Sequence, residues 1–81
     1  MLFDDINNMN NKYLKDMFNC AHDMLSHIPH STPECTLYAQ GYLSGGIAYA
    51  FRSCSITLEE WKYYNKKADE LLEWWRNGEK V

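Results

Sequence analysis

Histidine and cysteine side chains gather around the first predicted loop, where they raise the question of a metal site. Cys20, His22, His27, His30 and Cys35 all lie within the stretch 20–35. Structural zinc is usually held by closely spaced ligand pairs that converge tetrahedrally, and the stretch contains neither C-x-x-C nor H-x-x-x-H. Exposed histidines near a helix end, beside packed thiols, explain the cluster better. We therefore predict no metal site and no cofactor.

Cys54 is the best candidate for a nucleophile, because it lies in the loop sequence RSCSIT close to Arg52, and a nearby cation lowers the pKa of a thiol. Cysteine catalysis also needs a base and an oxyanion hole, and no histidine is close in sequence. The paired carboxylates Asp4-Asp5 and Glu59-Glu60 are explained by helix caps and helix dipoles. We therefore predict a protein that is not an enzyme.

The composition of the chain excludes several classes of function. The 81 residues carry a net charge of −3 and give a pI near 5.5, which argues against a general nucleic-acid binder because such proteins present a basic face. No apolar run approaches the roughly 18 residues of a membrane span. The N-terminus is acidic where a signal peptide would be basic, and three cysteines without framework spacing indicate free thiols. We expect a single cytoplasmic domain, 1–81, that is not bound to a membrane.

Three segments of the chain carry the sequence signals of helices. Apolar residues recur every three or four positions over about 9–28, which predicts an amphipathic helix that ends at Pro29. The shorter apolar segment before it is either a short helix that folds back or an early start of this helix. The third segment, about 58–77, begins with a capping box of Thr57 and Glu60, with Ile56 and Trp61 at the spacing of a hydrophobic staple. Its predicted core stripe is Leu58, Trp61, Tyr64, Ala68, Leu71, Leu72 and Trp75.

The middle segment can be read in two ways. Gly45-Gly46 between apolar residues resembles a two-residue hairpin turn, but STPE ahead of it is a helix start, with Thr32 as N-cap and Pro33 in the first turn. We favour a helix over about 33–53. Because it is apolar nearly all round, we expect it to be central and buried. Its small residues Gly41, Ser44, Gly45 and Ala48 would then allow close helix packing.

Together these segments predict an all-α fold, a small antiparallel three-helix bundle with helices at about 9–28, 33–53 and 58–77 and a short N-terminal lead-in. Surplus aromatic residues on the third helix suggest an interaction surface, since Trp and Tyr dominate binding energetics. A row of residues on this helix lies beside the predicted core stripe, and we predict that this row contacts a protein partner. Its members are Tyr63, Lys67, Glu70 and Trp74. The alternative is that the lead-in residues cover this row and leave no patch.

The run from GYLSGGIAYAF through SCSITLEEWKYY, about Gly41 to Trp75, resembles a pattern in short helical accessory proteins of bacteriophages and other mobile elements. Much of the shared pattern consists of helix-capping residues, and the resemblance implies no particular activity for this chain. The resemblance implies a small protein that binds and inhibits or regulates a larger host protein, including components of defence systems.

A second hypothesis is a nucleic-acid-associated regulator that dimerises through its small-residue helix. The second and third predicted helices, with the loop between them, have the outline of a helix-turn-helix, but Glu59 and Glu60 in the first turn of the third helix would repel phosphates. We therefore expect a non-enzymatic protein-interaction module whose partner is another protein or a second copy of the chain. We do not expect it to bind nucleic acid.

Overall fold

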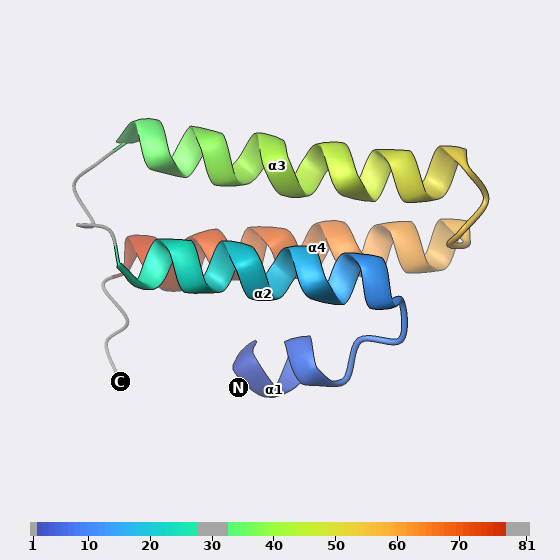
Figure 1. Cartoon of the computed structure of the whole chain (residues 1–81), viewed down its shortest axis with the longest axis horizontal. Helices are drawn as coiled ribbons and strands as arrows, with labels where there is room; N and C mark the ends of the chain where they lie inside the picture. The colour runs from blue at the N-terminus through green and yellow to red at the C-terminus, as the bar shows by residue number, and fades with distance from the viewer. Residues whose placement is uncertain (1, 28–32, 78–81) are drawn as a thin grey trace.

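The computed structural model describes residues 2–27 and 33–77 of the chain. It contains four helices in this part of the sequence, α1 (Leu2–Asn7), α2 (Lys12–Ser26), α3 (Pro33–Arg52) and α4 (Leu58–Arg76). The three long helices lie along one another and run alternately in opposite directions, with α3 above α2 and α4 in the view of Figure 1. The predicted antiparallel three-helix bundle is therefore confirmed, and the described residues contain no strand.

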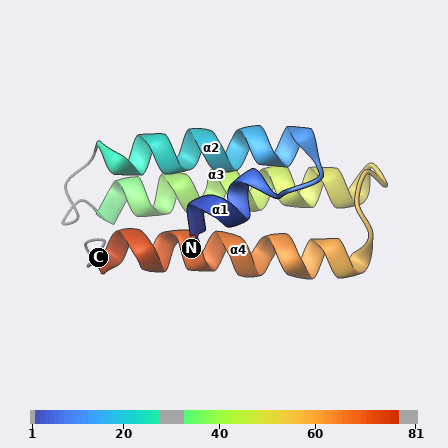
Figure 2. The same ribbon diagram turned by 90° about the horizontal axis from the view of Figure 1, so that it is seen from below.

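The N-terminal lead-in forms a short separate helix that folds back on the bundle. Figure 2 shows α1 crossing between α2 and α4, on the side of the bundle away from α3. Ile6 is fully buried there and Met9, in the connection to α2, is almost so. Of the two expectations for this segment, the folded-back helix is the one that the structure contains. Consequently α2 begins at Lys12 rather than at about residue 9.

Helix α2 begins with a cap that also ties it to α4. The Asn11 side chain accepts a hydrogen bond from the backbone N–H of Leu14 (3.0 Å), and its own backbone N–H donates to the Tyr64 hydroxyl (3.2 Å). Both bonds satisfy groups that a helix start leaves unpaired. The predicted apolar stripe is buried as expected. Its buried members are Leu14, Met17, Phe18, Ala21 and Leu25, whereas Ile28 and the expected end of this helix lie outside the described residues.

Helix α3 runs unbroken through Gly45-Gly46, so the hairpin alternative is wrong. It ends in a Schellman motif, in which the backbone N–H of Ser55 donates to the Ala50 carbonyl (2.8 Å) and that of Cys54 to the Phe51 carbonyl (3.0 Å). Cys54 occupies the left-handed position of this motif, with φ of 63°. Glycine is the usual residue there, because its missing Cβ removes the steric cost.

Helix α4 begins with the predicted capping box. The Thr57 backbone N–H donates to Glu60 Oε1 (2.8 Å), and the Glu60 backbone N–H donates to Thr57 Oγ1 (3.1 Å). Ile56, just before the cap, is buried, and Trp61 is half-buried against the core. These contacts set the angle at which the chain enters α4.

One hydrophobic core joins all four helices. Most of the stripe predicted for the last helix is buried, including Trp75 at 2% exposure, but Leu58 at its start is 51% exposed. From α3 the core takes one line of residues at helical spacing, Ala39, Leu43, Ile47 and Ala50. The middle helix is central, as expected, because it packs on both α2 and α4, but the expectation that it is buried on all sides is wrong. It packs on its neighbours through one face, and the opposite face is exposed.

Candidate interaction surface

The predicted row on α4 lies where α1 meets the bundle. Lys67 Nζ contacts Asp5 Oδ2 of α1 and Glu70 Oε1, each at 3.1 Å, and lies 5.5 Å from the centre of the Tyr63 ring. Only 16% of the Lys67 side chain is exposed. The row thus takes part in attaching α1 to α4, and its cation is already neutralised by two carboxylates.

The electrostatics of this contact favour the charged lysine. The hydrogen bond to Glu70 raises the pKa of Lys67 most, desolvation opposes it, and the hydrogen bond to Asp5 adds to the increase. Because the ammonium is held by carboxylates inside the chain, it is a weak anchor for a partner. Tyr63, at 40% exposure, is the most exposed apolar side chain of the row.

The adjacent tryptophans of α4 have different surroundings. Trp75 belongs to the buried core, whereas Trp74 is half-buried and packs against its edge. The Trp74 ring stacks on the His22 imidazole of α2, with ring centres 4.6 Å apart and an angle of 16° between the planes. The assignment of Trp75 to the core is confirmed. Trp74 is partly occupied by contacts within the chain, so its predicted role at an interface stays a prediction.

The small residues of α3 were expected to allow close packing, and the structure places that contact elsewhere. A Cβ added at Gly41 or Gly45 would meet no atom within 4 Å, whereas one added at Gly46 would overlap Sδ and Cε of Met17. Gly41, Ser44 and Gly45 are exposed and Ala48 is half-buried. The prediction is therefore wrong for packing inside the monomer, where Gly46 is the glycine that a neighbour approaches closely.

These small residues instead lie along an exposed surface, which we call the outer face of α3. At about 100° per residue, its positions cover roughly 140° of the helix circumference, opposite the core line. In Figure 1 no other helix lies over this side of α3. Its members are Glu34, Leu37, Tyr38, Gly41, Ser44, Gly45, Ala48, Tyr49 and Arg52.

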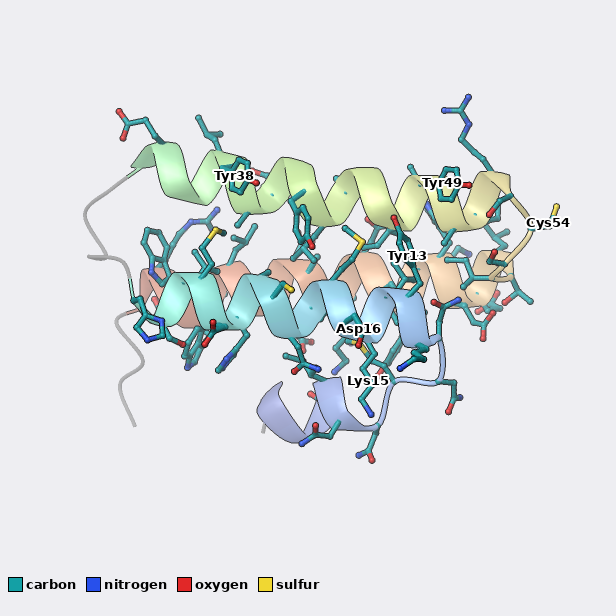
Figure 3. All side chains as sticks on the ribbon, viewed as in Figure 1. Tyr13, Lys15, Asp16, Tyr38, Tyr49 and Cys54 are labelled. Atoms are coloured by element: carbon teal, nitrogen blue, oxygen red, sulfur yellow. The ribbon has the colours of Figure 1, made fainter. Side chains whose placement is uncertain are left out.

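The outer face of α3 exposes large apolar side chains. Leu37 is 69% exposed, Tyr38 63% and Tyr49 64%, the three highest values among the large hydrophobic residues of the described chain. Figure 3 shows Tyr38 and Tyr49 towards opposite ends of α3, with Tyr13 of α2 reaching towards Tyr49. The Tyr13 and Tyr49 rings meet edge to face with centres 6.3 Å apart. The exposed aromatic surface therefore extends from α3 onto the start of α2.

Two shallow hollows flank these rings. One is lined by Gly45, Ala48, Tyr49, Arg52 and Ser53 at the C-terminal half of α3. The other lies between α2 and α3, where Tyr38 and Tyr42 stack with ring centres 6.3 Å apart. Desolvation, followed by the neighbouring Cys20 thiol, raises the pKa of Tyr42. The described residues that line the second hollow include no Lys, Arg, His, Asp or Glu, so this hollow presents an uncharged surface near Tyr38.

The residues considered for chemistry are dispersed. Among the described residues, no group of three or more His, Cys, Asp or Glu side chains is placed to hold a metal ion; His30 lies outside them, as does the side chain of Cys35. Cys20 and Cys54 are exposed free thiols, so the expectation of a packed thiol is wrong for Cys20. Figure 3 shows Cys54 pointing outward at the end of the bundle. None of the four described helices is long and apolar enough to cross a bilayer.

The helix-turn-helix outline does not match the packing. Helices α3 and α4 lie antiparallel and side by side in both views (Figures 1 and 2), whereas the two helices of a helix-turn-helix cross at roughly 90–120°. The first turn of α4 carries Glu59 and Glu60, and Glu60 is committed to the cap.

No protein-family model matches the chain, and neither a curated protein nor a solved structure matches it. The resemblance of the segment from Gly41 to Trp75 to accessory proteins of mobile elements therefore stays a prediction. The geometry of the surface is what bears on function, and sequence reasoning missed which face of α3 it occupies. Tyr38 and Tyr49 carried the signal, because they repeat at helical spacing on the side away from Ala39, Leu43 and Ile47.

Proposed function

We propose that this protein is a non-enzymatic protein-interaction module that binds its partner through the outer face of α3. The observation that carries the proposal is the exposure of Leu37, Tyr38 and Tyr49 on one uncovered helix face. A small chain gains stability by burying such side chains, so leaving three of them in water favours a surface that is covered in a complex.

The chemistry of the face suits protein recognition. Tyrosine combines a large apolar ring with a hydroxyl that stays hydrogen-bonded at a wet rim, and its two side-chain torsions lose little entropy on binding. The small side chains of Gly41, Gly45 and Ala48 leave room between the rings for a partner's side chains or backbone. Single Tyr anchors of this kind contribute about 2 kcal/mol or more to binding when they are central in an interface.

We further propose that the partner is a larger protein, which binding inhibits or regulates in the cytoplasm. The resemblance to phage accessory proteins supports this part of the proposal, as does the small size of the chain. The row of Tyr63, Lys67, Glu70 and Trp74 on α4 is the competing site. We favour α3 because its rings are more exposed and its charges are not paired within the described chain.

Affinity capture from source cells tests the proposal and distinguishes the two surfaces. The baits are the wild type, the double variant Tyr38→Ala/Tyr49→Ala, and Tyr63→Ala as a matched tyrosine control on α4. We expect the α3 double variant to lose a protein that the wild type and Tyr63→Ala both retain. Circular dichroism checks that each bait is folded. Loss with Tyr63→Ala alone would place the binding site on α4 and contradict the proposal.

A further inference from the structure

The outer face of α3 is complementary to itself. We propose that two copies of this chain pair through it, with their α3 helices antiparallel and a twofold axis at the level of Leu43 along the helix, on the side opposite that buried side chain. This inference goes beyond the proposed function: it concerns the same face, but it names a second copy of the chain as the occupant, and it can be tested independently of the larger partner.

The charges at the two ends of α3 favour an antiparallel pair. Glu34 lies in the first turn and Arg52 in the last, nine residues before and nine after Leu43. Both side chains are exposed, and neither forms an ion pair with another described residue. In an antiparallel pair centred at the level of Leu43 along the helix, Glu34 of each copy faces Arg52 of the other, so the symmetric contact contains two opposite-charge pairs.

The side-chain sizes agree with the same register. Residues equally far from Leu43 along the helix face each other, so Gly41 of one copy lies opposite Gly45 of the other. An added Cβ at either position meets nothing in the monomer, so the second backbone can approach closely at two points on either side of the axis. This is the arrangement by which small residues bring helices together.

Large side chains then lie beside small ones. Tyr38 of one copy falls opposite Ala48 of the other, next to the hollow lined by Gly45, Ala48, Tyr49, Arg52 and Ser53. On the same edge of the interface it comes beside the Tyr49 ring of the second copy. Leu37 takes the position opposite Tyr49 across the seam. Each contact occurs twice by symmetry, so one face provides both the rings and the space that receives them.

The area is sufficient for a weak, specific dimer. An aromatic side chain buries roughly 150–250 Å², and Tyr38 and Tyr49 are each nearly two-thirds exposed. The four rings of a pair therefore contribute roughly 500 Å², about half of the ~1,000 Å² that a specific interface needs. The length of α3, about 29 Å for 20 residues, supplies the remainder through Leu37, the small residues and the terminal charges. We expect a dissociation constant in the range of roughly 1–100 μM.

A charge-exchange cycle tests the pairing and its register. The full chain is studied by sedimentation velocity over a concentration series as the wild type, Glu34→Arg, Arg52→Glu and the double variant. Each single variant should raise the dissociation constant about tenfold, because symmetry replaces two attractive pairs by two repulsive ones. The double variant should return it to within about threefold of the wild-type value. Lys62→Glu, an exposed charge change on α4, is the control and should leave association unchanged.

A steric variant provides a second arm. Gly45→Leu places a good helix former at an exposed position with open space in the monomer, so the fold is retained while the close approach is blocked. We expect it to remain monomeric at concentrations where the wild type dimerises. Thermal melts of each variant in dilute solution verify that the helices are intact.

Three results would overturn the inference. The first is a wild type that is monomeric at 1 mM, about ten times the weakest dissociation constant expected here. The others are a dissociation constant that the single charge changes leave unchanged, or one that the double variant does not restore. A wild type that remains monomeric while the Tyr38→Ala/Tyr49→Ala bait loses its captured partner would refute self-pairing and leave the proposed function standing. Recovery in the double variant, with no partner lost by the α3 bait, would support self-pairing and contradict binding of a larger partner at this face.

Discussion

Replacing each of three glycines of α3 by alanine gives the most direct measurement of which side of this helix is packed. Gly41 and Gly45 are exposed in the helix interior and have open space where a Cβ would lie, whereas Gly46 faces Met17. The three substitutions are chemically identical and lie within six residues of one another. Differences in their effects therefore report the surroundings of each position.

The expected magnitudes follow from two opposing contributions. Alanine is better than glycine in a helix interior by about 0.8–1.0 kcal/mol, so Gly41→Ala and Gly45→Ala should each raise the free energy of unfolding by up to about 1 kcal/mol. For a domain of this size, that raises Tm by about 4–8 °C. At Gly46 the new methyl group must displace Met17 Sδ and Cε. Overpacking of this kind costs about 1–3 kcal/mol, so Gly46→Ala should lie between no change and a loss of about 2 kcal/mol.

Urea unfolding followed by circular dichroism measures these differences, at protein concentrations below 1 μM so that monomer stability is compared. The double variant Gly41→Ala/Gly45→Ala should show the sum of the single effects. In a Met17→Ala background, Gly46→Ala should no longer lower the free energy of unfolding, because the overlapping side chain is gone. The reasoning is refuted if Gly46→Ala stabilises the protein as much as the other two. It is also refuted if Gly41→Ala and Gly45→Ala destabilise the dilute monomer, since that would mean their outer face is packed within one chain.

Four further predictions test the elements around this helix. Cys54→Gly should stabilise the protein by about 1 kcal/mol because it removes the cost of a left-handed Cβ residue, and a lower urea midpoint than that of the wild type would contradict the Schellman assignment. Thr57→Ala should lower the free energy of unfolding by about 1 kcal/mol, because the capping box is lost. The same unfolding assay measures this loss, and the control Thr57→Ser, which keeps the hydroxyl acceptor, should lose much less. Trp75→Ala should cost about 3–5 kcal/mol and Trp74→Ala clearly less, because the first ring is in the core and the second at its edge; equal losses by thermal melting would show that both rings are core residues. Stability should fall as pH rises above the ordinary lysine pKa of 10.5 and through the raised pKa of Lys67, because the folded state holds that proton more tightly, and Lys67→Met should abolish this part of the pH dependence.

The candidate surface was only partly predictable from the residues. Rows of aromatic side chains on the last helix indicated an interaction surface, but Trp74 packs on His22 and Lys67 pairs with Asp5 of α1. Both contacts join residues about fifty or more positions apart in the chain. A local sequence pattern cannot show contacts between residues so far apart. The exposure of Tyr38 and Tyr49 likewise becomes clear only once the packed face of α3 is known.

The sequence by itself determined where α3 and α4 begin and how α2 and α4 face the core. Caps such as Thr57 with Glu60 act between residues three positions apart, and an amphipathic stripe needs only the helical period, so both can be read without any tertiary contact. Helix α3 has apolar residues on all sides, and that pattern does not specify which side is buried. Tertiary packing decided it, because α2 and α4 receive Ala39, Leu43 and Ile47 and thereby leave Tyr38, Gly41 and Tyr49 in water. Two helices, α2 and α4, cover one face of α3, and the other apolar side chains of this helix remain exposed.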